Sequence, residues 1–93
     1  MSEEAIKQRK NKAIKRAAES LKDVDYDVIL IPNNVFNIHA EREKEIRKIR
    51  IVLDEVSDGD LKIVREKIVA EICKKEIWCS EKRKKKFRKV LIN

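Results

Sequence analysis

The spacing of apolar residues changes near residue 26, and this change constrains the fold more than any other feature of the chain. Before it, apolar side chains recur at helical spacing, namely Ile6, Ala13, Ile14, Ala17, Ala18 and Leu21. After it, residues 26–31 form an apolar run rich in β-branched side chains, and residues 35–42 alternate between apolar and polar. The pattern predicts an N-terminal helix followed by a β-hairpin that turns at residues 32–34.

Two interpretations fit the segment that follows the hairpin. Residues 47–53 alternate as a strand would, whereas Ile46, Ile49, Leu53 and Val56 fit one face of a helix. We favour a third strand, because the segment is rich in β-branched side chains.

The C-terminal part of the chain has the signals of two helices. Ser57 and Asp60 have the spacing of a helix-capping box. The buried stripe of this helix would comprise Leu61, Val64, Ile68 and Ile72. Ser80 and Glu81 would cap a last helix that runs through Lys89. The predicted fold class is α+β, with an N-terminal helix, a small antiparallel sheet (β-β-β) and two C-terminal helices that share one face of the sheet.

Length and composition limit the class of protein. Ninety-three residues suffice for one domain with a modest core, so we expect residues 1–93 to form a single unit. One Gly, one Pro and abundant Ile, Lys and Glu resemble the composition of hyperthermophile proteins, which predicts a thermophilic source. The chain has a charged N-terminus and no apolar run near the roughly 20 residues of a membrane span. We therefore expect a cytoplasmic protein with no membrane partner.

The positive charge of the chain is concentrated at one end. The last twenty residues contain nine Lys or Arg against two Glu, which equals the whole net charge of +7, and the first 73 residues sum to zero. A cationic segment on a neutral body needs a polyanion or counterions, and nucleic acid is the commonest polyanion that a soluble protein meets. We therefore expect DNA or RNA as the partner, bound mainly through its phosphates and with little sequence preference. A segment that is merely solvated is the alternative.

Two basic surfaces would make these contacts, one in the C-terminal segment 80–93 and one on the first helix. The candidate residues are Arg9, Lys12, Lys15 and Arg16 in the helix, and Lys82, Arg83, Lys84, Lys85, Lys86, Arg88 and Lys89 in the segment. The two surfaces would line one groove if the ends of the chain lie on the same side. Trp78 and Phe87 flank the run and could stack on an unpaired base, although we favour a core position for Trp78.

The carboxylates around the predicted hairpin carry a second hypothesis. Hydrolysis of a phosphodiester with Mg²⁺ uses carboxylates on adjacent strands to hold the ion and a Lys to stabilise the developing charge. Residues 26–44 provide a strand, a Pro turn and a strand that ends in acid-x-acid-Lys, and in this they resemble the core of PD-(D/E)xK nucleases, including archaeal Holliday junction resolvases. The resemblance implies a Mg²⁺-dependent nuclease with Asp27, Glu41, Glu43 and Lys44 as catalytic candidates, and Glu41 in the place of the family's Glu. The simpler interpretation, which we favour, is that these acids are surface ion-pair partners, with no catalysis and no bound cofactor.

A third class of function is an interaction or assembly subunit whose basic end meets an acidic protein. A homodimer through an exposed sheet edge would belong to this class.

The chain has a single Gly and therefore no Gly-rich phosphate loop, and His39 is its only His. No arrangement of residues indicates nucleophilic catalysis.

Cys73 and Cys79 admit two interpretations. They are too few, with one His, to form a structural zinc site, so we expect no metal. They are either two small buried hydrophobic residues or the two halves of an intramolecular disulfide. The disulfide would require the preceding helix to end between them.

Overall fold

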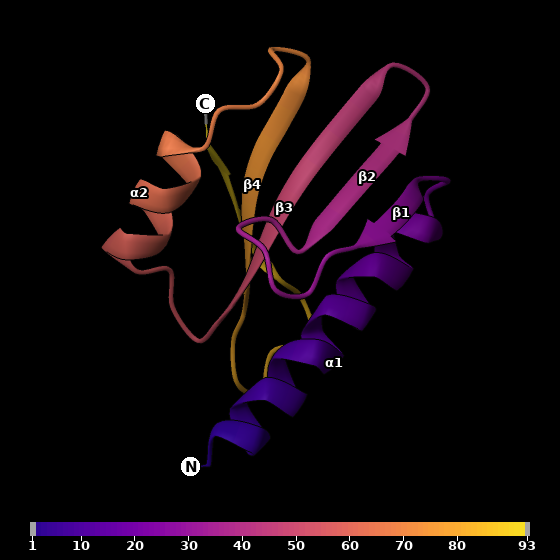
Figure 1. Ribbon diagram of the computed structural model, residues 1–93. Coiled ribbons are helices and arrows are strands. Elements are labelled where there is room, and N and C mark those ends of the chain that lie inside the picture. The colour runs from indigo at the N-terminus through magenta and orange to yellow at the C-terminus, as the bar shows by residue number, and fades with distance from the viewer. Residues whose placement is uncertain (1, 93) are drawn as a thin grey trace.

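A five-stranded mixed sheet forms the centre of the molecule, with the strands in the order β1-β2-β3-β4-β5. The computed structural model describes residues 2–92. Helix α1 (Glu3–Lys22) packs on one face of the sheet and the shorter α2 (Asp58–Glu66) on the other (Figure 1). The strands are β1 (Asp27–Leu30), β2 (Ile38–Arg42), β3 (Glu45–Leu53), β4 (Cys73–Ser80) and β5 (Arg88–Ile92). Strands β3 and β4 are parallel because α2 crosses between them, and all other neighbouring strands are antiparallel.

Helix α1 begins at a capping signal formed by residues close together in the sequence. The Ser2 side chain accepts a hydrogen bond of 3.2 Å from the Ala5 N–H, and acids occupy the first turn. The buried residues of α1 all lie from Ala13 onward, and none of residues 2–12 is buried. The N-terminal half of α1 therefore extends beyond the hydrophobic core, toward the lower end of the molecule in Figure 1.

The connection between β1 and β2 is longer than the predicted turn and is organised by the buried side chain of Asn37. Its amide nitrogen donates to the carbonyl oxygens of Pro32 (3.1 Å) and Asn34 (3.3 Å), and its Oδ1 accepts from the Ile51 N–H (2.9 Å). Asn37 has no exposed surface. Because both polar atoms of the buried amide have partners, the side chain holds residues 31–37 against β3 without an unsatisfied group.

Two apolar clusters pack the two faces of the sheet. The cluster beneath α1 includes Ile38, Ile49, Ile51 and Trp78. The cluster beneath α2 includes Val52, Val64, Ile77 and Cys79. Alternate residues of β3 and β4 point into each cluster, so both strands are buried on both faces at the end where α2 covers them.

The prediction of three antiparallel strands and two C-terminal helices is wrong, although the α+β class holds. The sheet has five strands and is mixed, and only one helix follows β3 within residues 2–92. Helix α2 starts at the predicted capping box of Ser57 and Asp60, but it ends at Glu66. Ile68 and Ile72 are therefore exposed rather than part of its buried stripe.

The segment predicted as the last helix, from Ser80 through Lys89, is instead the loop that joins the antiparallel strands β4 and β5, together with the start of β5. Residues 76–80 of β4 are all buried, because β4 lies between β3 and β5 and has an apolar cluster on each face. A helix would expose part of this segment to water. The strand therefore buries more apolar surface, including the whole of Trp78, which is 1% exposed as the sequence predicts for a core anchor.

The alternative of a disulfide between Cys73 and Cys79 is wrong. Both cysteines are free, and they lie at opposite ends of one strand, so no helix end lies between them. Six residues of extended strand span about 20 Å, whereas the Cα atoms of a disulfide lie within about 7 Å of each other. Burial raises the pKa of the Cys79 thiol, with Glu81 adding to the rise and Arg88 opposing it. Cys79 thus acts as a small hydrophobic residue of the core.

Candidate nucleic-acid interface

The basic run of the sequence forms the loop between β4 and β5. Five consecutive cations, residues 82–86, are exposed there. Arg83 has a left-handed backbone (φ 64°), which helps to reverse the chain between the two antiparallel strands. Arg88 and Lys89 lie in β5 instead of the loop. The loop between β4 and β5 therefore carries five adjacent, exposed positive charges.

Helix α1 lies beside this loop and contributes three further cations. Arg9, Lys12 and Arg16 occupy successive turns on one side of the helix. Two hollows separate them from the loop, with volumes of about 670 and 500 Å³, and both are lined by Arg16 and Lys85. We call the surface formed by Arg9, Lys12, Arg16 and residues 82–86 the basic groove. The two basic surfaces of the sequence thus lie on either side of one hollow.

Arg16 joins the two sides of the basic groove. Its guanidinium carbon lies 4.6 Å from the centroid of the Phe87 ring, and its Nη2 donates to the Ser80 hydroxyl at 3.1 Å. Ser80 ends β4 and Phe87 ends the loop, so this one side chain contacts both ends of the β4–β5 connection. The position of the loop relative to α1 is therefore fixed by direct contacts.

Some cations near the groove already have acidic partners. Arg9 pairs with Asp54 (2.8 Å) and holds the pKa of that carboxyl below its ordinary value. Glu81 pairs with Lys84 (3.0 Å) and more distantly with Arg88 (3.6 Å). Within residues 2–92, the groove cations that make no ion pair are Lys12, Arg16, Lys82, Arg83, Lys85 and Lys86. The acids near the groove therefore neutralise only part of its charge.

Neither aromatic residue that flanks the basic run is free to stack on a base. Trp78 is buried in the core, and its ring centroid lies 5.5 Å from that of Phe87. Phe87 is half-buried between Trp78 and the guanidinium of Arg16. Lys89 in turn lies 4.3 Å from the Trp78 ring centroid. The Phe87 ring therefore supports Arg16 of the groove, and the Trp78 ring supports Lys89 outside it.

Lys15, which the sequence groups with Arg9, Lys12 and Arg16, lies on the other flank of α1. It lines a separate pocket with Lys7 and Lys10. Lys10 was recognisable in the sequence, because it interrupts the apolar stripe of the first helix. No sequence signal pointed to Asp54, whose left-handed backbone (φ 67°) at the end of β3 is stabilised by a hydrogen bond of 2.8 Å to the Ser80 carbonyl oxygen.

The four catalytic candidates are not gathered into one site. The register pairs Asp27 with Glu41, so these two carboxylates are neighbours on the sheet face opposite α1. Glu43 and Lys44 lie in the turn between β2 and β3, where Glu43 has φ 54°. Glu41 also lies 3.6 Å from His39. Across residues 2–92, no three His, Cys, Asp or Glu side chains are placed to hold a metal ion together.

Comparisons with protein-family models, curated proteins and solved structures found no match. Neither α1 nor α2 is long and apolar enough to cross a membrane. The function is therefore inferred from the geometry of the surface, where the basic groove brings eight cations together.

Proposed function

We propose that this protein binds nucleic acid and holds the phosphate backbone in the basic groove. The observation that carries the proposal is the convergence of α1 with the β4–β5 loop, which brings cations from both ends of the chain to one hollow. Like charges so arranged repel each other, and phosphates placed between them neutralise both sides and release counterions. Contacts of this kind position a protein without reading bases, so the proposed function is binding with little sequence preference and no catalysis.

The cations of the groove differ in how readily they reach a phosphate. Lys82, Arg83, Lys85 and Lys86 are exposed and have no ion pair within the described part of the chain. Lys84 has one, but exposed ion pairs contribute only about 0–1 kcal/mol, so a phosphate can replace the carboxylate. The loop is therefore the main contact, and the cations of α1 support it.

Two other functions fit the same chain less well. An acidic protein would also neutralise the groove, but protein interfaces depend on buried aromatic or apolar anchors, and Phe87 is covered by Arg16. A metal-dependent nuclease of the PD-(D/E)xK type would use Asp27 and Glu41, which lie on the opposite side of the sheet from α1. The tests below include a result that would favour each of these two functions over nucleic-acid binding.

The binding test neutralises the loop without removing it. The loop variant carries Lys82→Gln, Arg83→Gln, Lys85→Gln and Lys86→Gln. A control variant with the same change of net charge carries Lys44→Gln, Lys62→Gln, Arg65→Gln and Lys67→Gln, all at exposed positions outside the groove. Substitution is preferable to truncation, because β5 follows the loop and buries Ile92 in the core.

Fluorescence anisotropy at low salt, with a labelled DNA duplex of about 20 base pairs, measures the outcome. The loop variant should bind more than about tenfold more weakly than wild type, and the control variant within about threefold of it. Equal losses in both variants would mean that the groove has no special role. Failure of wild type to bind DNA and RNA, together with binding to an acidic protein, would favour the assembly function.

A further inference from the structure

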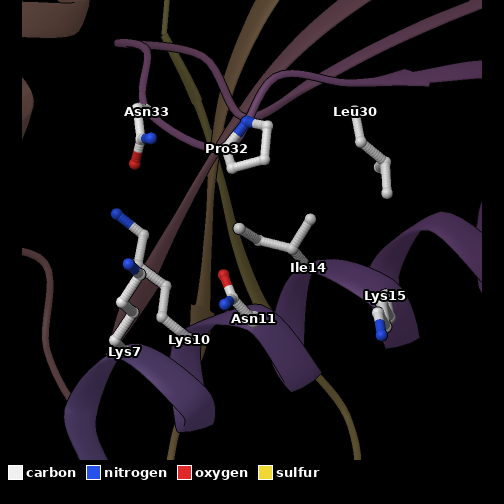
Figure 2. Close-up of a pocket in the computed structure, with 8 residues that line it drawn as sticks. All are labelled: Lys7, Lys10, Asn11, Ile14, Lys15, Leu30, Pro32 and Asn33. Carbon is white, nitrogen blue, oxygen red and sulfur yellow. The ribbon is translucent and has the colours of Figure 1, made fainter. Parts of the chain in front are cut away.

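A second basic pocket lies on the flank of α1 opposite the basic groove. Its cations are Lys7, Lys10 and Lys15 of α1, and it is completed by Asn11, Ile14, Leu30, Pro32 and Asn33. Its volume is about 330 Å³. Figure 2 shows the Lys7 and Lys10 side chains extending side by side toward Asn33, with Lys15 at the other end of the pocket. The pocket thus has lysines along α1 and apolar side chains, namely Ile14, Leu30 and Pro32, in the rest of its wall.

The lysines of this pocket have no anionic partner among residues 2–92. Glu3 and Glu19 stand four residues from Lys7 and Lys15 along α1, but neither forms an ion pair with them in the described residues. Lys10 is half-buried, and burial lowers the pKa of its ammonium group, with Arg50 adding to the fall and Asp60 opposing it. An anion bound in the pocket would offset this cost of keeping Lys10 charged.

The two basic surfaces are separated by the width of one helix. An α-helix with its side chains is about 10–12 Å across. The major groove of B-form DNA is about 12 Å wide and is bordered on both sides by phosphates. The exposed ridge of α1 between the two surfaces is polar and includes Gln8. A duplex that receives this ridge in its major groove would place one phosphate strand on each flank.

The aromatic residues argue against a single strand as the ligand. Proteins that bind single strands use exposed aromatic side chains on which successive bases stack. The chain has one Trp, one Tyr and two Phe. Trp78, Tyr26 and Phe36 are buried, and Phe87 lies beneath Arg16.

The deep, narrow major groove of A-form RNA does not admit a helix, which leaves B-form DNA as the duplex that fits.

We propose that the pocket of Lys7, Lys10 and Lys15 is a second phosphate-binding site, and that a B-form DNA duplex straddles α1 with one strand in this pocket and the other in the basic groove. The inference rests on the proposed function, because it takes the basic groove as the site of the first strand. It assigns a ligand to three lysines that the fold does not otherwise use, and it selects duplex DNA over a single strand or RNA.

The test removes the second pocket alone. The pocket variant carries Lys7→Gln, Lys10→Gln and Lys15→Gln, and its control carries Lys22→Gln, Lys44→Gln and Lys62→Gln. Each protein is titrated with a DNA duplex, the matching RNA duplex and one DNA strand, and the salt dependence is recorded. The pocket variant should have a slope of log K against log[salt] on duplex DNA that is shallower by about 2 to 3, and an unchanged slope on the single strand.

Acetylation of lysines in the wild-type complex supplies a readout that does not depend on a variant. Bound duplex DNA should protect Lys7, Lys10 and Lys15 from acetylation, while a single strand protects only lysines of the basic groove. An unchanged duplex slope in the pocket variant, or no protection of these three lysines, would overturn the inference while the groove proposal stands. If the loop variant also binds the duplex as wild type does, the proposed function fails as well.

Discussion

The guanidinium of Arg16 covers the ring of Phe87, with 4.6 Å between the guanidinium carbon and the ring centroid. This contact joins the first helix to the β4–β5 loop, two segments at opposite ends of the chain. It adds to the packing of Phe87 against Trp78 and the apolar cluster beneath α1, which also holds the end of the loop in place. The pair therefore links the packing of the core to the geometry of the basic groove.

Replacing Arg16 with Gln should weaken binding more than replacing Lys12 with Gln, although each substitution removes one charge. Arg16 has a ring beneath it and a hydrogen bond to Ser80, whereas the structure gives Lys12 no hydrogen bond or ion pair within residues 2–92. Arg16→Gln should lower the free energy of unfolding by about 1 kcal/mol, and Lys12→Gln should leave it unchanged. Urea unfolding and anisotropy measure the two effects. Equal loss of binding in the two variants would show that Arg16 does not position the loop.

Asn37→Ala should destabilise the fold by about 3 kcal/mol, because it leaves the buried Ile51 N–H and two part-buried carbonyl oxygens without their side-chain partner. Asn37→Asp should be at least as harmful, since a carboxylate cannot donate to the carbonyl oxygens of Pro32 and Asn34. Thermal and urea unfolding test this, with Asn33→Ala at an exposed position of the same loop as the control. A loss below about 1 kcal/mol for Asn37→Ala would mean that water replaces the side chain.

The sequence predicted the elements whose signals are local. The apolar spacing and Ser2 cap of α1, the alternation of β3 and the capping box of α2 each depend on residues a few positions apart. Ile68 and Ile72 continue the helical spacing of α2 beyond its end, so the sequence predicted a longer helix and gave no sign of β4. Residues 76–80 of β4 are buried on both faces, because an apolar cluster covers each side of the sheet there, and a strand buried on both faces has no alternation to detect.

The candidate site was predictable in composition but not in arrangement. Counting charges was enough to find the cations of α1 and of residues 82–89. Their distribution was not predictable, because the flank of α1 that faces residues 82–86, with Arg16 but not Lys15, is set by where the sheet places the β4–β5 loop. The loop form of the run depends on the pairing of β4 with β5, a contact between residues that no local pattern records.

Asp60 should make the stability of the fold depend on acid pH. Its burial raises the pKa of the carboxyl, but hydrogen bonds from Ser57 and the ion pair with Arg50 outweigh this, so the pKa in the folded protein is lowered. The unfolded pKa is about 3.9. The contribution of Asp60 is therefore complete above that pH and is lost as the pH falls through the lower folded pKa.

Asp60→Asn should accordingly cost about 1 kcal/mol at neutral pH, and the difference from wild type should shrink below about pH 4. Asp58→Asn, at an exposed position in the same helical turn, is the matched control. Urea unfolding between about pH 2 and 7 gives the comparison. A difference that stays constant over this range would contradict the role assigned to the carboxylate.

The separation of the catalytic candidates predicts no cleavage of DNA. Plasmid, single-stranded and branched DNA should remain intact with Mg²⁺ or Mn²⁺, because Glu43 and Lys44 are not placed with the pair formed by Asp27 and Glu41. Glu41→Gln should leave DNA binding unchanged, since Glu41 lies outside the basic groove. Metal-dependent cleavage that Glu41→Gln abolishes would replace the binding function with the nuclease implied by the sequence resemblance.

The salt dependence of duplex binding tests the central claim most directly. Each phosphate neutralised on duplex DNA contributes about −0.9 to the slope of log K against log[salt]. Wild type should give a slope of about −4 or steeper, and the loop variant at positions 82, 83, 85 and 86 a slope shallower by about 3 to 4. The charge-matched control variant should keep the wild-type slope. Identical slopes in the loop variant and wild type would contradict the claim that the basic groove holds the phosphate backbone.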